Sequence, residues 1–172
     1  MNMTETSARL YLLNFDEVRT YLWAAVFVAC NMVLPQVAHL VPQGGVVFAP
    51  LSLVVIVGAC KLGWKTGLLA AVLSPLVNNL VFGMPAWGVL PVMAVKLAVL
   101  AVAAGMMVQR MGRVTVPVLV GAVLMGELLG GVAEWALTGS VAATVADFCV
   151  GWPGLLLQTL GGWLIVNRLW TK

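Results

Sequence analysis

Residues 88–109 read GVLPVMAVKLAVLAVAAGMMVQ, and Lys96 is the only charged side chain in this run. A helix of about 20 apolar residues is needed to cross the hydrocarbon core of a bilayer, which is about 30 Å thick. The run therefore predicts a membrane-spanning helix. A charged side chain in the middle of such a helix is costly to insert, so Lys96 marks a position of interest.

The whole chain shares the composition of this run. Of its 172 residues, 62% are hydrophobic and 9% are charged, and the mean hydropathy is +1.06. Soluble domains are about 45–50% apolar and about 25% charged, so we expect an integral membrane protein surrounded by the lipid bilayer. The net charge of +3 comes from scattered Lys and Arg residues rather than a basic stripe. No nucleic acid partner is therefore expected.

Six apolar windows lie between polar residues and Pro or Gly turns. They cover residues 20–38, 46–62, 65–82, 88–109, 114–137 and 149–168. The chain is therefore predicted to be an all-α integral membrane protein, a bundle of six transmembrane helices forming a single membrane domain over residues 1–172. Residues 1–19 are polar and charged, and no small-residue cleavage site follows the first apolar run, so they are expected to remain as a cytoplasmic segment.

The basic residues predict an orientation for this bundle, because they alternate between successive connections. Both chain ends and the second and fourth connections carry Lys or Arg, whereas the other three connections carry none. The residues on the basic side are Arg9, Arg19, Lys61, Lys65, Arg110, Arg113, Arg168 and Lys172. Cytoplasmic loops of membrane proteins are rich in Lys and Arg, so both termini are predicted to lie in the cytoplasm.

Small residues spaced four apart predict where helices approach one another closely. The pairs Gly63-xxx-Gly67 and Gly126-xxx-Gly130 each place two glycines on one helical face. Such faces allow the backbones of neighbouring helices to come together.

With the predicted orientation, the polar side chains inside the spans gather in the outer half of the bundle. Lys96 and Glu127 lie deep in their spans, and Glu134 is on the same helical face as Glu127, seven residues away. We expect Lys96 and Glu127 to face the interior, near each other, either as a structural ion pair or in contact with a ligand. The residues predicted to bind a substrate are His39, Gln43, Asn78, Asn79, Lys96, Glu127, Glu134, Trp152 and Gln158.

Some of these residues have a structural alternative. Asn78 and Asn79 can form hydrogen bonds between helices, and Trp152 can belong to the aromatic belt at the membrane surface. No metal site is expected, because His39 is the only histidine and the three cysteines lack metal-binding spacing. No cofactor is predicted either. The chain carries no motif with a catalytic nucleophile or metal ligand set, so it is not expected to be an enzyme.

Four features together match a known family. They are six spans in a chain of this length, both termini inside, the pattern Ala25-xxx-Ala29 in the first span, and the run SPLVNNLVFGMPAWGVLPVM over residues 74–93. On these features the chain resembles the substrate-binding S component of an energy-coupling factor (ECF) transporter, the class that takes up vitamins in bacteria and archaea.

The resemblance implies a substrate site near the outer face and a transmembrane coupling subunit that docks on the face of Ala25 and Ala29. It also implies two cytoplasmic ATPases as partners, location in the cytoplasmic (inner) membrane of a bacterium or archaeon, and a small water-soluble vitamin or related micronutrient as substrate. The chain begins MNM rather than with the Met-His start of nickel and cobalt members, so a metal substrate is not expected. Lys96 and the two intramembrane glutamates favour a polar or zwitterionic molecule.

Two other classes of function stay open at this stage. A non-transporting multi-span membrane scaffold is the main alternative, although the cytoplasmic connections are only a few residues long and offer a partner little surface. An intramembrane enzyme would use Glu127 and Glu134 as acid and base, but no nucleophile or metal set accompanies them.

Overall fold

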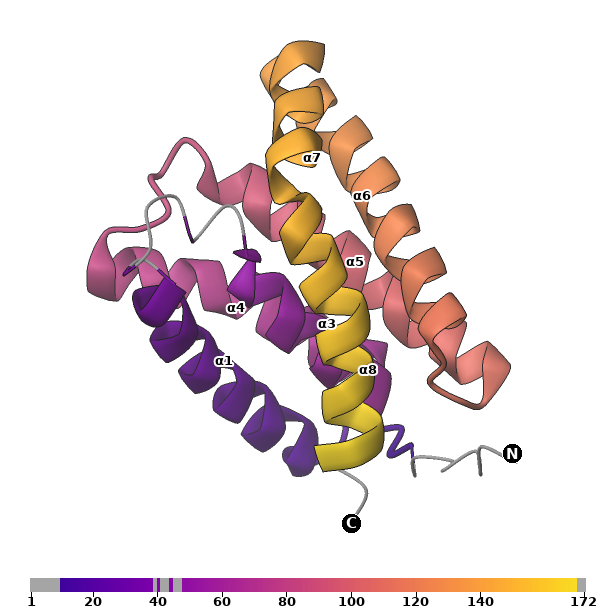
Figure 1. The fold of residues 1–172 in the computed structure, drawn as a ribbon. Coiled ribbons are helices and arrows are strands. Elements are labelled where there is room, and N and C mark those ends of the chain that lie inside the picture. Colours follow the sequence, from indigo (N-terminus) through magenta and orange to yellow (C-terminus); the bar gives the residue numbers. More distant parts are fainter. Residues whose placement is uncertain (1–9, 39, 41–43, 45–47, 170–172) are drawn as a thin grey trace.

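The structure is a computed structural model, and it describes residues 10–38, 40, 44 and 48–169. Every regular element in these residues is a helix, which confirms the predicted all-α class (Figure 1). The principal helices are α1 (Val18–Ala38), α3 (Pro50–Leu62), α4 (Trp64–Phe82), α5 (Leu90–Met111), α6 (Val116–Thr138) and α7 (Val141–Leu156). The chain continues from α7 through the π-helical η1 (Leu157–Gly161), α8 (Gly162–Leu164) and the π-helical η2 (Ile165–Leu169).

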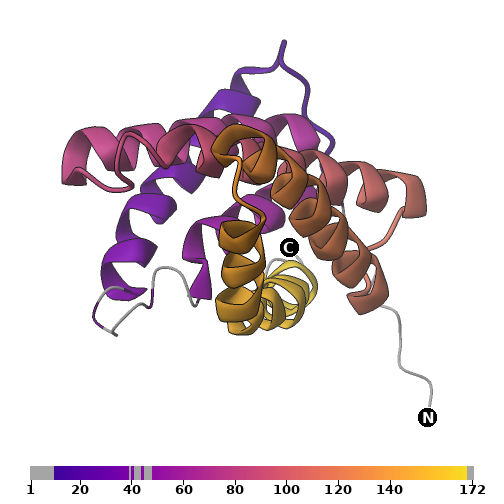
Figure 2. The same cartoon turned by 90° about the horizontal axis from the view of Figure 1, so that it is seen from above.

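Five helical segments are long and apolar enough to cross a membrane, as expected of a multi-pass membrane protein. They are Val18–Ala38, Trp64–Phe82, Leu90–Met111, Val116–Thr138 and Thr144–Arg168. In both views α1 and α6 lie on opposite sides of the long last helix that begins with α7 (Figures 1 and 2).

The second predicted span, residues 46–62, contains a helix that is shorter than the other predicted spans. The helix found there, α3, has 13 residues. At 1.5 Å per residue it is about 20 Å long, shorter than the bilayer core of about 30 Å. Ten of its residues are buried, and it packs against α1, α4, α5 and the last helix. Neighbouring helices therefore cover α3 on several sides, and its crossing of the membrane stays a prediction.

Glycines set the closest helix contacts, and Gly67 belongs to one of the predicted small-residue patterns, whereas Gly105 does not. A Cβ atom on Gly67 of α4 would lie 2.5 Å from the Cβ atom of Ala59 in α3. On Gly105 of α5 it would lie 2.5 Å from the Cβ atom and 2.6 Å from the Cα atom of Trp64 in α4. Only a residue without a side chain fits at either place, so α3, α4 and α5 pack almost backbone to backbone.

The helix ends that carry basic residues lie together. The basic residues of the described ranges are Arg19, Lys61, Lys65, Lys96, Arg110, Arg113 and Arg168, and all except Lys96 are in or next to a terminal turn of a helix. Lys65 Nζ donates a hydrogen bond to Asn14 Oδ1 at 2.7 Å, and Asn167 Nδ2 donates to the carbonyl oxygen of Val114 at 2.9 Å. These bonds join the chain start, α4, the start of α6 and the last helix at one end of the bundle.

A buried polar cluster ties α1 to α4 in the other half of the bundle. Asn31 Nδ2 donates a hydrogen bond to Ser74 Oγ at 2.9 Å, and both residues are fully buried. Asn78 Nδ2 donates to the carbonyl oxygens of Asn31 and Ser74, both at 2.9 Å. Hydrogen bonds between membrane helices contribute about 0.6 kcal/mol on average, so the main effect of this cluster is to fix the register of the two helices.

Candidate functional site

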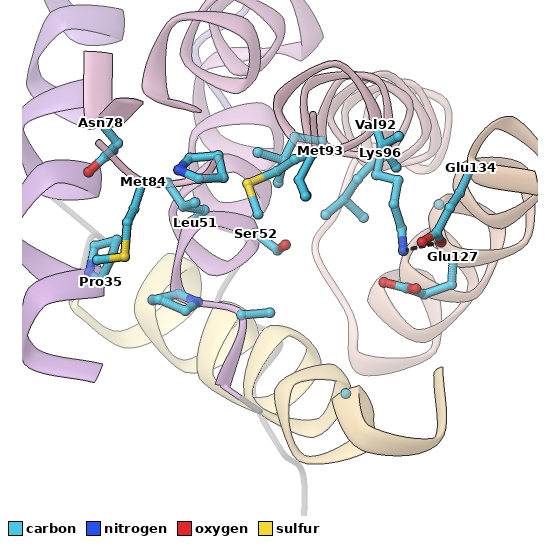
Figure 3. A pocket seen from close by; sticks show the side chains of 18 of the residues that line it. Pro35, Leu51, Ser52, Asn78, Met84, Val92, Met93, Lys96, Glu127 and Glu134 are labelled. Atoms are coloured by element: carbon cyan, nitrogen blue, oxygen red, sulfur yellow. Dashed lines mark hydrogen bonds and ion pairs between the residues drawn. The ribbon is translucent and has the colours of Figure 1, made fainter. Parts of the chain in front are cut away.

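A cavity of about 540 Å³ lies in the half of the bundle away from the terminal basic residues. Its wall comes from the end of α1, the start of α3, the end of α4 and the following turn, α5, α6 and α7. Helices far apart in the sequence therefore converge on one space, and Figure 3 shows their side chains pointing into it.

The charged side chains of this cavity stand at one of its ends. Lys96 Nζ lies 2.9 Å from Glu134 Oε2, which makes a hydrogen-bonded ion pair between α5 and α6. The Lys96 side chain is 22% exposed and that of Glu134 is 9% exposed. Glu127 lines the cavity beside this pair (Figure 3). The sequence predicted Lys96 near Glu127. Both residues line this end of the cavity, and an ion pair also joins Lys96 to Glu134.

The register of α5 against α6 explains this choice of partner. The two helices run antiparallel, with Gly126 against Leu100 and Gly130 against Lys96. Lys96 therefore lies between the levels of Glu127 and Glu134. Side chains in a helix tilt toward its N-terminus. In antiparallel helices this tilt carries Lys96 and Glu134 toward each other.

Most of the remaining cavity wall is apolar. Leu97 and Leu100 of α5 belong to this wall, as do Met93 and Met84, and Met84 lies at the end away from the ion pair (Figure 3). Ser52 and Gln36 add isolated polar groups. None of these residues was among the predicted site residues. For the apolar ones the reason is that a side chain lining a cavity and one facing lipid look alike in a sequence of this composition.

The two neighbouring asparagines have different surroundings. Asn78 lines the cavity, while its Nδ2 atom holds the backbone carbonyls of α1 and α4. Asn79 is not among the cavity residues, and its Nδ2 atom donates to the carbonyl oxygen of Pro85 at 2.6 Å. Asn78 therefore both forms the interhelical hydrogen bond of the structural alternative and lines the cavity. Asn79 instead anchors the turn between α4 and α5.

Two other predicted site residues lie away from the cavity. Trp152 on α7 is 59% exposed and does not line the cavity, in keeping with the aromatic-belt alternative. Gln158 is 1% exposed and lies in the π-helical turn η1, outside the cavity wall, and its Oε1 atom has no hydrogen-bond partner among the described residues. The structure therefore brings together Asn78, Lys96, Glu127 and Glu134 from the predicted set.

The remaining predictions concern the first outer connection and the partner face. His39 and Gln43 lie outside the described residues. Ala25 and Ala29 are exposed on α1, one turn apart on the same face of the helix.

The chemistry of the site is that of a binding cavity. Within the described ranges, no three His, Cys, Asp or Glu side chains lie close enough to hold a metal ion. The cavity instead offers one ammonium and two carboxyl groups at one end of an apolar space. Such a combination, apolar walls with a few polar groups at fixed places, is typical of small-molecule sites.

Comparison of the chain with protein-family models, with curated proteins and with solved structures finds no match.

Proposed function

We propose that the chain is the substrate-binding S component of an ECF-type importer and that it captures a small water-soluble vitamin or related micronutrient in the cavity. The observation that carries this proposal is the cavity itself, about 540 Å³ in volume with Lys96, Glu127 and Glu134 at one end. Small-molecule cavities span about 300–1,000 Å³. Intramembrane ionisable residues on such a wall favour a functional role, because inserting them is costly.

The proposal includes a coupling subunit that spans the membrane and two ATPases in the cytoplasm. The coupling subunit is proposed to dock on α1, where Ala25 and Ala29 are exposed and leave room for another helix to approach. The proposed location is the cytoplasmic membrane of a bacterium or archaeon, with the cavity in the outer half.

The proposed orientation can be tested with single cysteines at the two ends of the bundle. In a background with Cys30 and Cys149 changed to serine, the remaining native cysteine, Cys60, is buried. A membrane-impermeant maleimide is expected to label Thr138→Cys in intact cells, and Met111→Cys only after permeabilisation, because Arg110 and Arg113 should lie inside. Both positions are exposed at helix ends. Labelling of Met111→Cys in intact cells would contradict the orientation.

The function is tested by purifying the protein from its native membrane in a mild detergent and identifying its companions by mass spectrometry. We expect a retained small molecule together with a coupling subunit and ATPase chains, and uptake of that molecule that depends on all of them. Partner chains without any small molecule are the result that a scaffold predicts. That outcome, combined with no thermal stabilisation across a panel of vitamins, would overturn the transport proposal.

A further inference from the structure

The formal charges of the ionisable side chains that line the cavity do not add up to zero. Among the described residues of its wall, the ionisable ones are Lys96, Glu127 and Glu134. In their ionised forms they carry a net charge of minus one. Charges away from bulk water are stable when opposite charges neutralise them, so the cavity favours a ligand with a positive charge.

The ion pair makes the cavity less suited to an anion. Lys96 Nζ already lies 2.9 Å from Glu134 Oε2. An anionic ligand would have to compete with Glu134 for the ammonium group, and it would place a third negative charge beside two carboxylates. A cationic ligand requires no such displacement, because carboxylate oxygens accept several hydrogen bonds each. This comparison concerns the total charge and holds whatever other contacts Lys96 and Glu127 make.

The apolar part of the cavity wall indicates the chemical character of the uncharged part of the ligand. Figure 3 shows the charged residues at one end and Met84 and Asn78 at the other, with Met93 between them. Methionine is flexible and polarisable, and it packs well on aromatic rings. The apolar part of the cavity therefore suits an apolar or aromatic body that extends away from the charged end.

We infer that the cavity takes an organic cation, a molecule with a protonated nitrogen at one end and an apolar body at the other. The nitrogen donates to the carboxylates of Glu127 and Glu134, and the body lies against α5. This inference rests on the proposed function and names its class of substrate. It narrows the polar or zwitterionic molecule expected from the sequence to one in which the cationic group decides the binding.

Three probes that share one ring system test this inference by calorimetric titration at pH 7. Tryptamine carries a protonated amine, tryptophol a hydroxyl group and indole-3-propionate a carboxylate. The purified protein is placed in nanodiscs of a zwitterionic lipid, and binding to empty nanodiscs is subtracted. We expect tryptamine to bind at least about tenfold more tightly than indole-3-propionate, with tryptophol between them.

The variant Glu127→Gln removes one carboxylate charge and keeps the size of the side chain. It is expected to lower the preference for tryptamine by about tenfold. The matched control Glu17→Gln makes the same chemical change in the segment before α1, outside the cavity, and is expected to keep the wild-type preference. Equal effects of the two variants would overturn the inference.

The other outcomes separate this inference from the proposed function. Tighter binding of the carboxylate probe would overturn the organic cation and leave the transport proposal standing. If no probe binds, the small molecule that co-purifies with the protein is the test of the inference. A cationic nitrogen in this molecule supports an organic cation as the ligand, and a molecule without a cationic nitrogen overturns it. If no probe binds and no small molecule co-purifies, both proposals fail.

Discussion

Replacing Gly105 by alanine is expected to destabilise the folded bundle by about 2 kcal/mol, within the range of overpacked cores. The added Cβ atom would lie 2.6 Å from Trp64 Cα and 2.7 Å from Trp64 N, so the backbone of α4 itself must move. Alanine favours a helix over glycine by about 1 kcal/mol, and the clash has to exceed this gain. We expect the thermal midpoint to fall by roughly 5 °C.

The midpoint is measured with a thiol-reactive fluorescent dye in the background that lacks Cys30 and Cys149. Cys60 is 1% exposed, so its reaction reports unfolding. Gly151→Ala is the matched control, because Gly151 is also helical and a Cβ atom there meets no atom within 4 Å. We expect this control to keep or raise the midpoint. A midpoint for Gly105→Ala equal to that of Gly151→Ala would contradict the close contact of α4 and α5.

Replacing Lys96 by methionine is the second change with a large expected effect. It leaves Glu127 and Glu134 facing the cavity without the ammonium group. Breaking a buried ion pair by removing one partner costs about 3–5 kcal/mol. Because Lys96 is 22% exposed, we expect a smaller loss of stability. A loss of about 2 kcal/mol is the expected size, measured with the same dye assay.

A double-mutant cycle identifies the partner of Lys96. The double variant Lys96→Met with Glu134→Gln removes both charges of the pair, so it is expected to be more stable than Lys96→Met alone. Glu134→Gln alone is expected to cost less than Lys96→Met, because Glu127 stays in the same cavity as the lysine. The absence of a coupling energy between Lys96 and Glu134 would contradict the ion pair described above.

The charged residues of the cavity could be predicted from the sequence, but their contacts with one another could not. The cost of a charge in the bilayer led directly to Lys96, Glu127 and Glu134, and all three line the cavity. The ion pair between Lys96 and Glu134 could not be predicted in the same way, because this contact depends on the register of α5 against α6. That register follows from the contacts of Gly126 and Gly130 with the facing helix.

The helix α3 and the predicted polar residues outside the cavity show where sequence reasoning ends. Hydropathy measures how apolar a segment is and not whether lipid or protein surrounds it, so the burial of α3 among its neighbours could not be predicted. Predicted depth grouped Asn79 and Gln158 with the cavity residues. Depth alone does not give the direction of a side chain around its helix, and the π-helical turn at Gln158 changes that direction further.

The measurement that most directly tests the cavity as the ligand site uses the variant Gly151→Phe. Gly151 lines the cavity, and a Cβ atom there would meet no other atom within 4 Å, so we expect this position to accept a phenyl ring that reduces the volume of the cavity. Val150→Phe is the control, one residue away and outside the cavity wall. Native mass spectrometry then gives the fraction of protein that retains the co-purified small molecule. We predict that Gly151→Phe retains about tenfold less than wild type while Val150→Phe retains the wild-type fraction. Equal retention by the two variants would contradict the cavity as the binding site.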